Sequence, residues 1–181
     1  MGNYNTKAIF SPKLTPAFTL FNTDTFSQLT HIRMMQTILK LEMLLDTAVN
    51  YLNAATVTEL EAKPAPDKWS KKEILGHLID SALHNLQRFV EVQFESKPYT
   101  VRKYKQDECV AANDYQHADI EGLTQCWLSL NRRIIHLMNL QTPDTLAFEV
   151  VIDDKTTEDL RFLMTDYVEH LEHHLNQIRG L

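Results

Sequence analysis

Four long segments of the chain place apolar residues three and four positions apart, the spacing that gathers them on one face of an α-helix. These segments run from about Thr25 to Ala54, from Ser70 to about Glu95, from Ile120 to Leu140, and from about Thr157 to Arg179. The third has the clearest apolar seam: Ile120, Leu123, Trp127, Leu130, Ile134 and Leu137. A helix with one apolar stripe must bury it against other elements. The pattern predicts an all-α four-helix bundle, and the third seam favours antiparallel packing.

The connections between these segments define one domain. Residues 1–23 contain Pro12 and Pro16 and are predicted to form an irregular N-terminal arm, which leaves 24–181 as the bundle. The run Ser70-Lys71-Lys72-Glu73 has the capping-box pattern of a helix start. Pro143 is expected to end the third helix, and residues 146–152, rich in β-branched side chains, are predicted to form a single extended turn or ribbon.

Composition narrows the possible partners and compartments. Lys and Arg number 18 against 24 Asp and Glu, a net charge of −6 without a basic run, which disfavours nucleic acid as a partner. No apolar run approaches the roughly 20 residues that cross a bilayer, and the N-terminus lacks a secretion-signal pattern, so we expect no membrane partner. The two isolated cysteines, Cys109 and Cys126, fit neither a disulfide framework nor a zinc finger. We therefore expect a cytoplasmic protein, with Cys126 as a small core residue.

Histidines cluster in the last helical segment, where three of the eight in the chain lie. On a helical wheel, His174 lies about 50° and His170 about 90° from the centre of the apolar stripe, on the same side. His173 lies about 150° away and is expected to face water. His170 and His174 therefore form an i, i+4 pair whose imidazoles can share one metal ion.

A third ligand does not follow from periodicity. His77 lies about 60° outside its own apolar stripe, which suits either the wall of a cleft or an ordinary surface histidine. His84 is one heptad further along, roughly 10 Å away by helix rise, so it cannot bind the same ion. His136 is expected to be exposed, whereas His31 and His117 cannot be placed. From spacing alone, solvated or capping histidines are a better explanation of the pair than a metal site is.

Two sequence runs resemble the DinB/YfiT-like superfamily. Residues 69–80, WSKKEILGHLID, are similar to its W-S-x-x-E-x-x-x-H-L-x-D pattern, and residues 167–178, YVEHLEHHLNQI, to its C-terminal Y-x-x-H-x-x-H-H-x-x-Q-I pattern. The connection from Tyr104 to Tyr115 resembles the polar connection of the family. The resemblance covers about 29–178. It implies a four-helix bundle, commonly a homodimer, with one divalent metal ion, Zn²⁺ or Ni²⁺ being usual, held by His77, His170 and His174.

The resemblance also implies a function and a class of partner. Members resemble metal-dependent hydrolases, or transferases that join a low-molecular-weight thiol such as bacillithiol to an electrophile, so a small-molecule substrate or thiol is expected. Three neutral imidazoles leave one coordination position open, and water and thiol chemistry need the same ligands. Asp80, three residues after His77, and Asp107, in the polar connection, are the candidate catalytic acids or bases. Either carboxylate could instead be solvated or cap a helix.

Two other functions remain open at this point. The protein could be a stress-associated bundle that binds a small ligand without turning it over, since the sequence offers no assured general base. It could also be a metal-free structural dimer with surface histidines. Trp69 and Tyr167 are expected to be packing residues in each case.

Overall fold

The structure, a computed structural model, describes residues 17–181, and four long helices form its body. They are α1 (Ala17–Ala54), α3 (Lys71–Glu91), α5 (Ile120–Asn139) and α7 (Leu160–Arg179). The predicted four-helix bundle is confirmed. Helix α1 begins at Ala17 rather than near Thr25, so the end of the predicted arm is helical, while residues 1–16 lie outside the described part of the chain.

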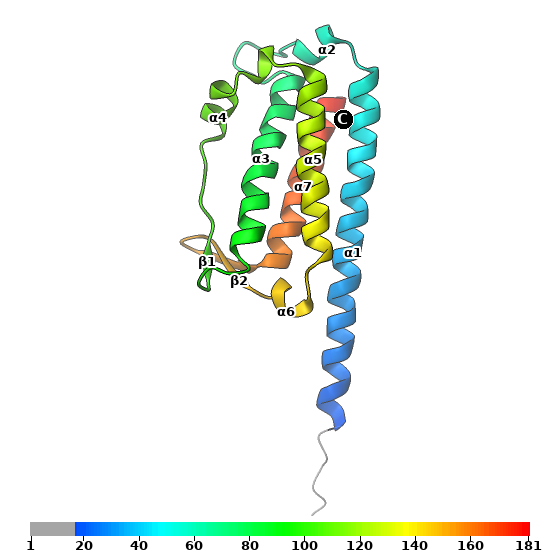
Figure 1. Ribbon diagram of the computed structural model, residues 1–181, viewed down its shortest axis with the longest axis vertical. Helices are drawn as coiled ribbons and strands as arrows, with labels where there is room; N and C mark the ends of the chain where they lie inside the picture. Colours follow the sequence, from blue (N-terminus) through cyan, green and yellow to red (C-terminus); the bar gives the residue numbers. More distant parts are fainter. Residues whose placement is uncertain (1–16) are drawn as a thin grey trace, which may run out of the picture.

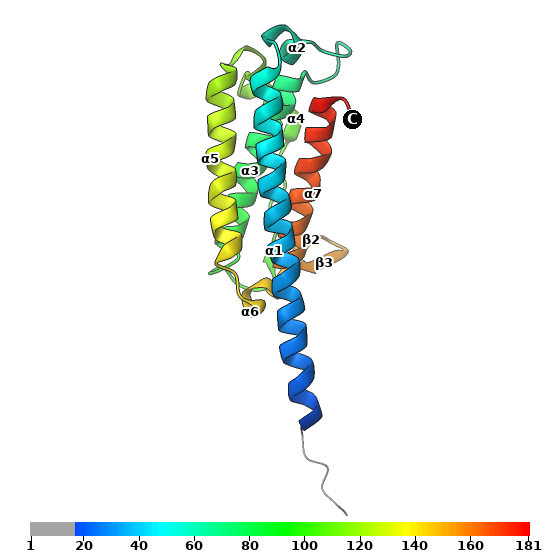
Figure 2. The same cartoon turned by 90° about the vertical axis from the view of Figure 1, so that its right-hand side faces the viewer.

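The helices do not alternate simply in direction. Helices α1 and α7 run one way and α3 and α5 the other, as the colours of Figures 1 and 2 show. The antiparallel packing predicted for 120–140 therefore holds against α1, but the extensive contact of α5 with α3 is parallel. The difference arises because residues 92–119 return the chain along the length of the bundle before α5 starts.

Short elements occupy the connections. Helix α2 (Val57–Glu61) follows α1, and the return segment contains β1 (Tyr99–Thr100), α4 (Gln106–Ala112) and the 3₁₀ helix η1 (Tyr115–His117). Helix α5 ends at Asn139, before Pro143, and Pro143 instead opens the short helix α6 (Pro143–Leu146). The sequence patterns predicted none of these short elements.

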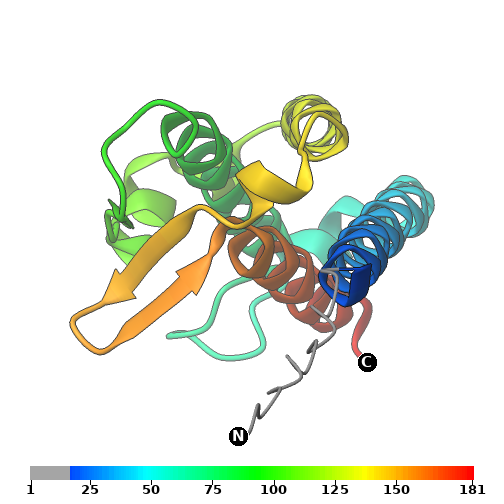
Figure 3. The ribbon, with the colours of Figure 1, turned by 90° about the horizontal axis from the view of Figure 1, so that it is seen from below.

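A three-stranded sheet lies at the end of the bundle where α7 begins (Figure 3). Strands β2 (Glu149–Asp153) and β3 (Thr156–Asp159) are antiparallel, and β1 joins β2 in parallel with Tyr99 opposite Val150. The ribbon predicted for residues 146–152 is thus one strand of a sheet. Helix α7 starts at Leu160 rather than near Thr157 because residues 156–159 pair with β2, and the Asp159 side chain then accepts the N–H of Phe162.

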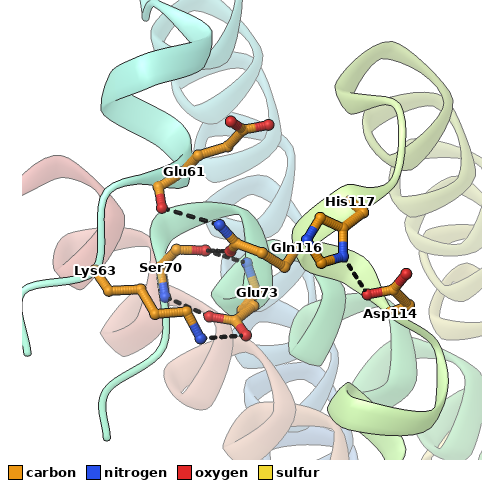
Figure 4. Close-up of polar contacts among 7 residues, drawn as sticks. All are labelled: Glu61, Lys63, Ser70, Glu73, Asp114, Gln116 and His117. Atoms are coloured by element: carbon orange, nitrogen blue, oxygen red, sulfur yellow. Dashed lines mark hydrogen bonds and ion pairs between the residues drawn. The ribbon is translucent and has the colours of Figure 1, made fainter. Parts of the chain in front are cut away.

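The start of α3 is held by the predicted capping box, which the structure confirms (Figure 4). The Glu73 N–H donates to Ser70 Oγ at 3.1 Å, and the Ser70 N–H donates to the Glu73 carboxylate at 2.8 Å. Lys63 donates to the same carboxylate, and the Ser70 hydroxyl donates to Gln116 Oε1 at 2.6 Å. These bonds tie the first turn of α3 to the α2 and η1 segments and fix where the next turns point.

The core is apolar where the four helices meet, with Leu41, Leu75, Trp127, Ile134 and Leu171 fully or almost fully buried. Cys126, expected in this core, is exposed instead because α5 buries the neighbouring positions Leu123 and Trp127. Within residues 17–181, no helix is long and apolar enough to cross a membrane.

Candidate metal centre

Three histidines meet at one end of the interface between α3 and α7. His77 lies in the second turn of α3, and His170 and His174 lie in the last turns of α7. Because these two neighbouring helices run in opposite directions, the start of one faces the end of the other. Ligand nitrogens of the three side chains lie within 4.8 Å of one another. The pair that the helical wheel selected thus gains the third histidine that the family resemblance indicated.

The spacing of the donor atoms suits a tetrahedral ion. His77 Nε2 and His170 Nε2 are 3.3 Å apart. Two nitrogens bound to one zinc at about 2.0–2.1 Å with a tetrahedral angle lie roughly 3.3–3.4 Å apart, so the pair needs little rearrangement. Three histidines without a thiolate or carboxylate also match the donor set of catalytic zinc sites that keep an open position.

Electrostatics keeps these imidazoles neutral, the form that binds a metal. Burial lowers the pKa of His77 to about 4, and the neighbouring His174 and His170 add to the effect. Burial likewise lowers the pKa of His170 to about 4, followed by the effects of His174 and His173. The pKa of His174 is also lowered, chiefly by burial, although its bond to Gln177 opposes the shift. At neutral pH, three lone pairs are therefore available at one point.

The Nδ1 atoms of the three imidazoles have different surroundings. His174 Nδ1 lies 2.8 Å from Gln177 Oε1, so a protonated Nδ1 can donate a hydrogen bond to this oxygen and leave Nε2 free for a metal. His170 Nδ1 lies 3.5 Å from Ser81 Oγ, at the limit of a hydrogen bond. His77 Nδ1 is buried and has no hydrogen-bond partner among the residues that the structure describes. The side chain of Gln177 thus orients one imidazole of the cluster, a role that the sequence did not indicate.

The remaining histidines separate from the cluster. His173 and His136 are exposed, as predicted, and His31 and His117 are exposed as well. His84 stacks on Tyr104 with the ring centroids 4.0 Å apart. His77 differs from its expectation, because it is completely buried rather than at the edge of its stripe. The ring of Trp69 covers it, with the two ring centroids 5.0 Å apart.

Two cavities open beside the cluster. The first, of about 610 Å³, is lined by Trp69, Asp107, His174 and Gln177 among others. Trp69, expected only to pack, therefore forms part of the site. The second, of about 280 Å³, reaches His170 and Tyr167, whose buried hydroxyl donates to Asn131 Oδ1 at 2.6 Å. A further hollow of about 480 Å³, between α1 and the start of α7, contains none of the three histidines.

The two candidate carboxylates lie in different places. Asp107 is exposed in the first turn of α4 and lines the larger cavity together with His174. Asp80 is buried beside the return segment, where its Oδ1 accepts the Tyr115 hydroxyl at 2.8 Å and the Asn113 amide at 3.2 Å. Burial raises the Asp80 pKa, opposed by the Tyr115 hydrogen bond and by His84. Among described contacts, none joins Asp80 to the three imidazoles.

A row of polar residues on α3 escaped the sequence analysis. Although they are polar, Ser81, Asn85 and Arg88 face the bundle interior beside His170; the first two are buried and Arg88 is half-buried. They follow His77 at intervals of four, four and three positions, which is the same spacing that identifies an apolar stripe. A search of the core face for polar rather than apolar residues could have found them.

Comparison with known proteins supports the fold. A profile described as the DinB superfamily matches residues 40–178. No match was found among curated protein sequences. Among solved structures, YfiT from Bacillus subtilis, described as a probable metal-dependent hydrolase with an unusual four-helix bundle topology, is 22% identical. The similarity has a TM-score of 0.73 and covers 81% of this chain and 84% of that one.

A second neighbour is a mycothiol-dependent maleylpyruvate isomerase, 12% identical with a TM-score of 0.63. The similarity covers 78% of this chain, which spans 59% of that enzyme. At these identities, the two neighbours establish the shared bundle architecture. The match of the family profile to residues 40–178 covers most of the sequence, and the chain therefore belongs to the DinB superfamily.

Proposed function

We propose that this protein is a metal-dependent enzyme, a hydrolase or a low-molecular-weight-thiol S-transferase, in which His77, His170 and His174 hold one divalent cation. Zn²⁺ and Ni²⁺ are the ions we favour, because neutral imidazoles suit both. The observation that carries the proposal is the convergence of three neutral imidazoles, with ligand atoms within 4.8 Å, beside two cavities. A bound cation would supply Lewis acidity, which lowers the pKa of a coordinated water or thiol.

In this proposal, other residues of the chain orient the histidines, exclude water and transfer a proton. Gln177 fixes the ring of His174, and the Trp69 ring shields His77 from water. Asp107 lines the same cavity as His174, so we assign it the transfer of a proton to or from the substrate. Asp80 holds Tyr115 and Asn113 and, in this proposal, positions the return segment that forms one wall of the site.

Turnover tests this assignment. The zinc- or nickel-loaded protein is assayed with activated esters and amides, and separately with small thiols plus an electrophile. We expect turnover in one of the two assays, lost in His77→Ala and reduced in Asp107→Asn. The matched control is His136→Ala, which removes an exposed histidine on α5 and should leave the rate unchanged. Hydrolysis without added thiol would select the hydrolase, whereas strict dependence on thiol would select the transferase.

A non-catalytic bundle that binds a small ligand is the second candidate. It is favoured by one observation: among the described residues, no carboxylate contacts the three imidazoles, and Asp107 is exposed rather than held beside them. In that case, both assays would stay at the background rate while the loaded protein still bound thiols or carboxylates. Turnover that disappears in His77→Ala would exclude it.

The proposal extends to assembly, because the family resemblance implies a homodimer. Helix α1 carries apolar side chains that are half-exposed or more on the side away from the bundle core: Leu29, Ile32, Leu39 and Met43. Exposed apolar stripes of this kind are common where two chains meet. We therefore propose a second copy of the chain as the partner of α1.

A further inference from the structure

A buried polar stripe leads away from the three-histidine cluster along α3. Ser81, Asn85 and Arg88 continue the helical line of His77 on the face that packs against α7. Burying polar groups in a bundle core costs free energy unless they are hydrogen-bonded or serve a ligand. The hydrogen bonds that its members make, and those left unmade, therefore indicate whether the stripe serves the fold alone or also a ligand.

The members of the stripe are linked by hydrogen bonds. Asn85 Nδ2 donates to the Ser81 carbonyl at 2.9 Å, and Ser81 Oγ lies near His170 Nδ1. At the far end, Arg88 Nη1 donates to Asn85 Oδ1 at 3.3 Å, and Nη2 donates to the Arg102 carbonyl at 2.7 Å. These bonds hold the guanidinium in place and leave further N–H groups for a ligand.

Arg88 has an unusual environment for a cation. Burial lowers the pKa of its guanidinium, and its centre lies 6.0 Å from the ring of Tyr104. Among the described residues, no carboxylate forms an ion pair with it. A half-buried arginine without an acidic partner is costly, and a bound anion would offset that cost.

The cavity of about 280 Å³ joins this arginine to the histidine cluster. His170 and Ser81 line one end, and Arg88 and Leu163 line the other, since α3 and α7 are antiparallel. Lys103 adds a second positive charge, and Asp166, whose pKa burial raises, adds an acidic one. Seven residues of helix separate Ser81 from Arg88, which corresponds to roughly 10 Å.

We propose that Arg88, with Lys103, is a carboxylate-binding subsite for the substrate whose reacting end lies at His77, His170 and His174. The substrate class is then an elongated small molecule with a metal-binding or reacting group at one end and a carboxylate at the other. Asn85 of α3 and Tyr167 of α7 lie between these ends along their helices and line the middle of the cavity. This inference rests on the proposed metal-dependent function for its first end, and on Arg88 for its second.

The test compares two thiols of equal length. Full-length protein loaded with cobalt is titrated with mercaptooctanoate and with mercaptooctanol, and thiolate binding is followed by the charge-transfer absorption of the cobalt. We expect the acid to bind at least about tenfold more tightly than the alcohol, the effect of one good charge-assisted contact. Arg88→Gln should remove that preference and leave the affinity for the alcohol unchanged. The control, Arg102→Gln, changes an exposed arginine outside the cavity lining and should keep the preference.

Each outcome separates the two proposals. Equal affinity for acid and alcohol, or an acid preference that survives Arg88→Gln, would overturn the carboxylate subsite and leave the metal site standing. Absence of cobalt binding would overturn the proposed function. The subsite is then tested in metal-free protein by titration with octanoate, followed through the NMR signals of arginine side chains. A shift of the signal that Arg88→Gln removes supports the subsite, and an unshifted signal refutes it.

Discussion

Gly76, one residue before His77, lies against Tyr115 of the return segment, which leaves no room for a side chain. A Cβ atom at this position would overlap the ring of Tyr115. We expect Gly76→Ala to displace that ring and to lower the free energy of unfolding by about 1–3 kcal/mol, the usual effect of overpacking. Urea unfolding measures the loss. Gly122→Ala is the control, because its Cβ would meet only Asp119 Oδ2 at 3.3 Å; a parent-like Gly76→Ala would contradict the packing.

Asp80 should make stability depend on pH. Because burial raises its pKa, the folded chain binds this proton more tightly than the unfolded chain does. Its ionisation therefore lowers stability as pH rises from about 3.9, the ordinary Asp value, through the raised folded value. Asn cannot ionise, so Asp80→Asn should gain stability relative to the parent as pH increases through this window.

Melting temperatures of the parent and Asp80→Asn between acidic and neutral pH measure this difference. Asp46→Asn, at an exposed position of α1, serves as the control and should follow the parent. A difference between parent and Asp80→Asn that stays constant with pH would show that Asp80 does not titrate as its surroundings imply.

At the scale of elements, the first turn of α3 is the local structure that we expect to position His77. Ser70 is fully buried, and its hydroxyl accepts from Glu73 and donates to Gln116. Ser70→Ala should cost about 1–3 kcal/mol of unfolding free energy, the loss of a cap together with an unpaired buried group. Because His77 follows two turns later, the affinity for zinc should fall as well.

Urea unfolding and zinc titration measure the two effects of Ser70→Ala. Thr142→Ala removes the corresponding cap of α6, which is exposed and far along the chain from the histidines. It should cost less stability and leave zinc affinity unchanged. Equal losses in the two variants would mean that the α3 cap has no special part in positioning His77.

Local patterns predicted much of this architecture. The capping box of α3 and the i, i+4 pair His170/His174 depend on neighbours in sequence, and the structure contains both. The burial of His77 depends on the Trp69 ring lying over it. The pairing of β2 with β1 joins residues that are roughly fifty positions apart in the sequence. The parallel arrangement of α3 and α5 follows from the path of the return segment, which no periodicity encodes.

The polar stripe of α3 illustrates a different limit. Ser81, Asn85 and Arg88 interrupt an apolar face, so a search for apolar periodicity treats them as noise. They become meaningful only when the fold places α7 and Tyr104 beside them. His77, the proposed third metal ligand, was likewise indicated by family resemblance rather than by its position on a helical wheel.

At the scale of the whole molecule, the outer stripe of α1 should control assembly. If a second copy covers Leu39 and Met43, light scattering of the full chain will give twice the mass of one chain. Leu39→Glu should reduce the mass to that of one chain, because a charge cannot be buried there without a partner. The control Glu42→Gln changes an exposed neighbour and should remain dimeric. A monomeric parent would contradict the proposed homodimer.

The proposed metal centre consists of three imidazoles and one cation. Elemental analysis of zinc after reconstitution and extensive dialysis tests it in the parent, in His174→Ala and in His173→Ala. His173 is the matched control because it is adjacent to His174 in sequence but exposed and outside the cluster. We expect one tightly held zinc per chain in the parent and in His173→Ala, and its loss in His174→Ala. A parent without stoichiometric zinc or nickel, or a His174→Ala variant that keeps its metal as the parent does, would contradict it.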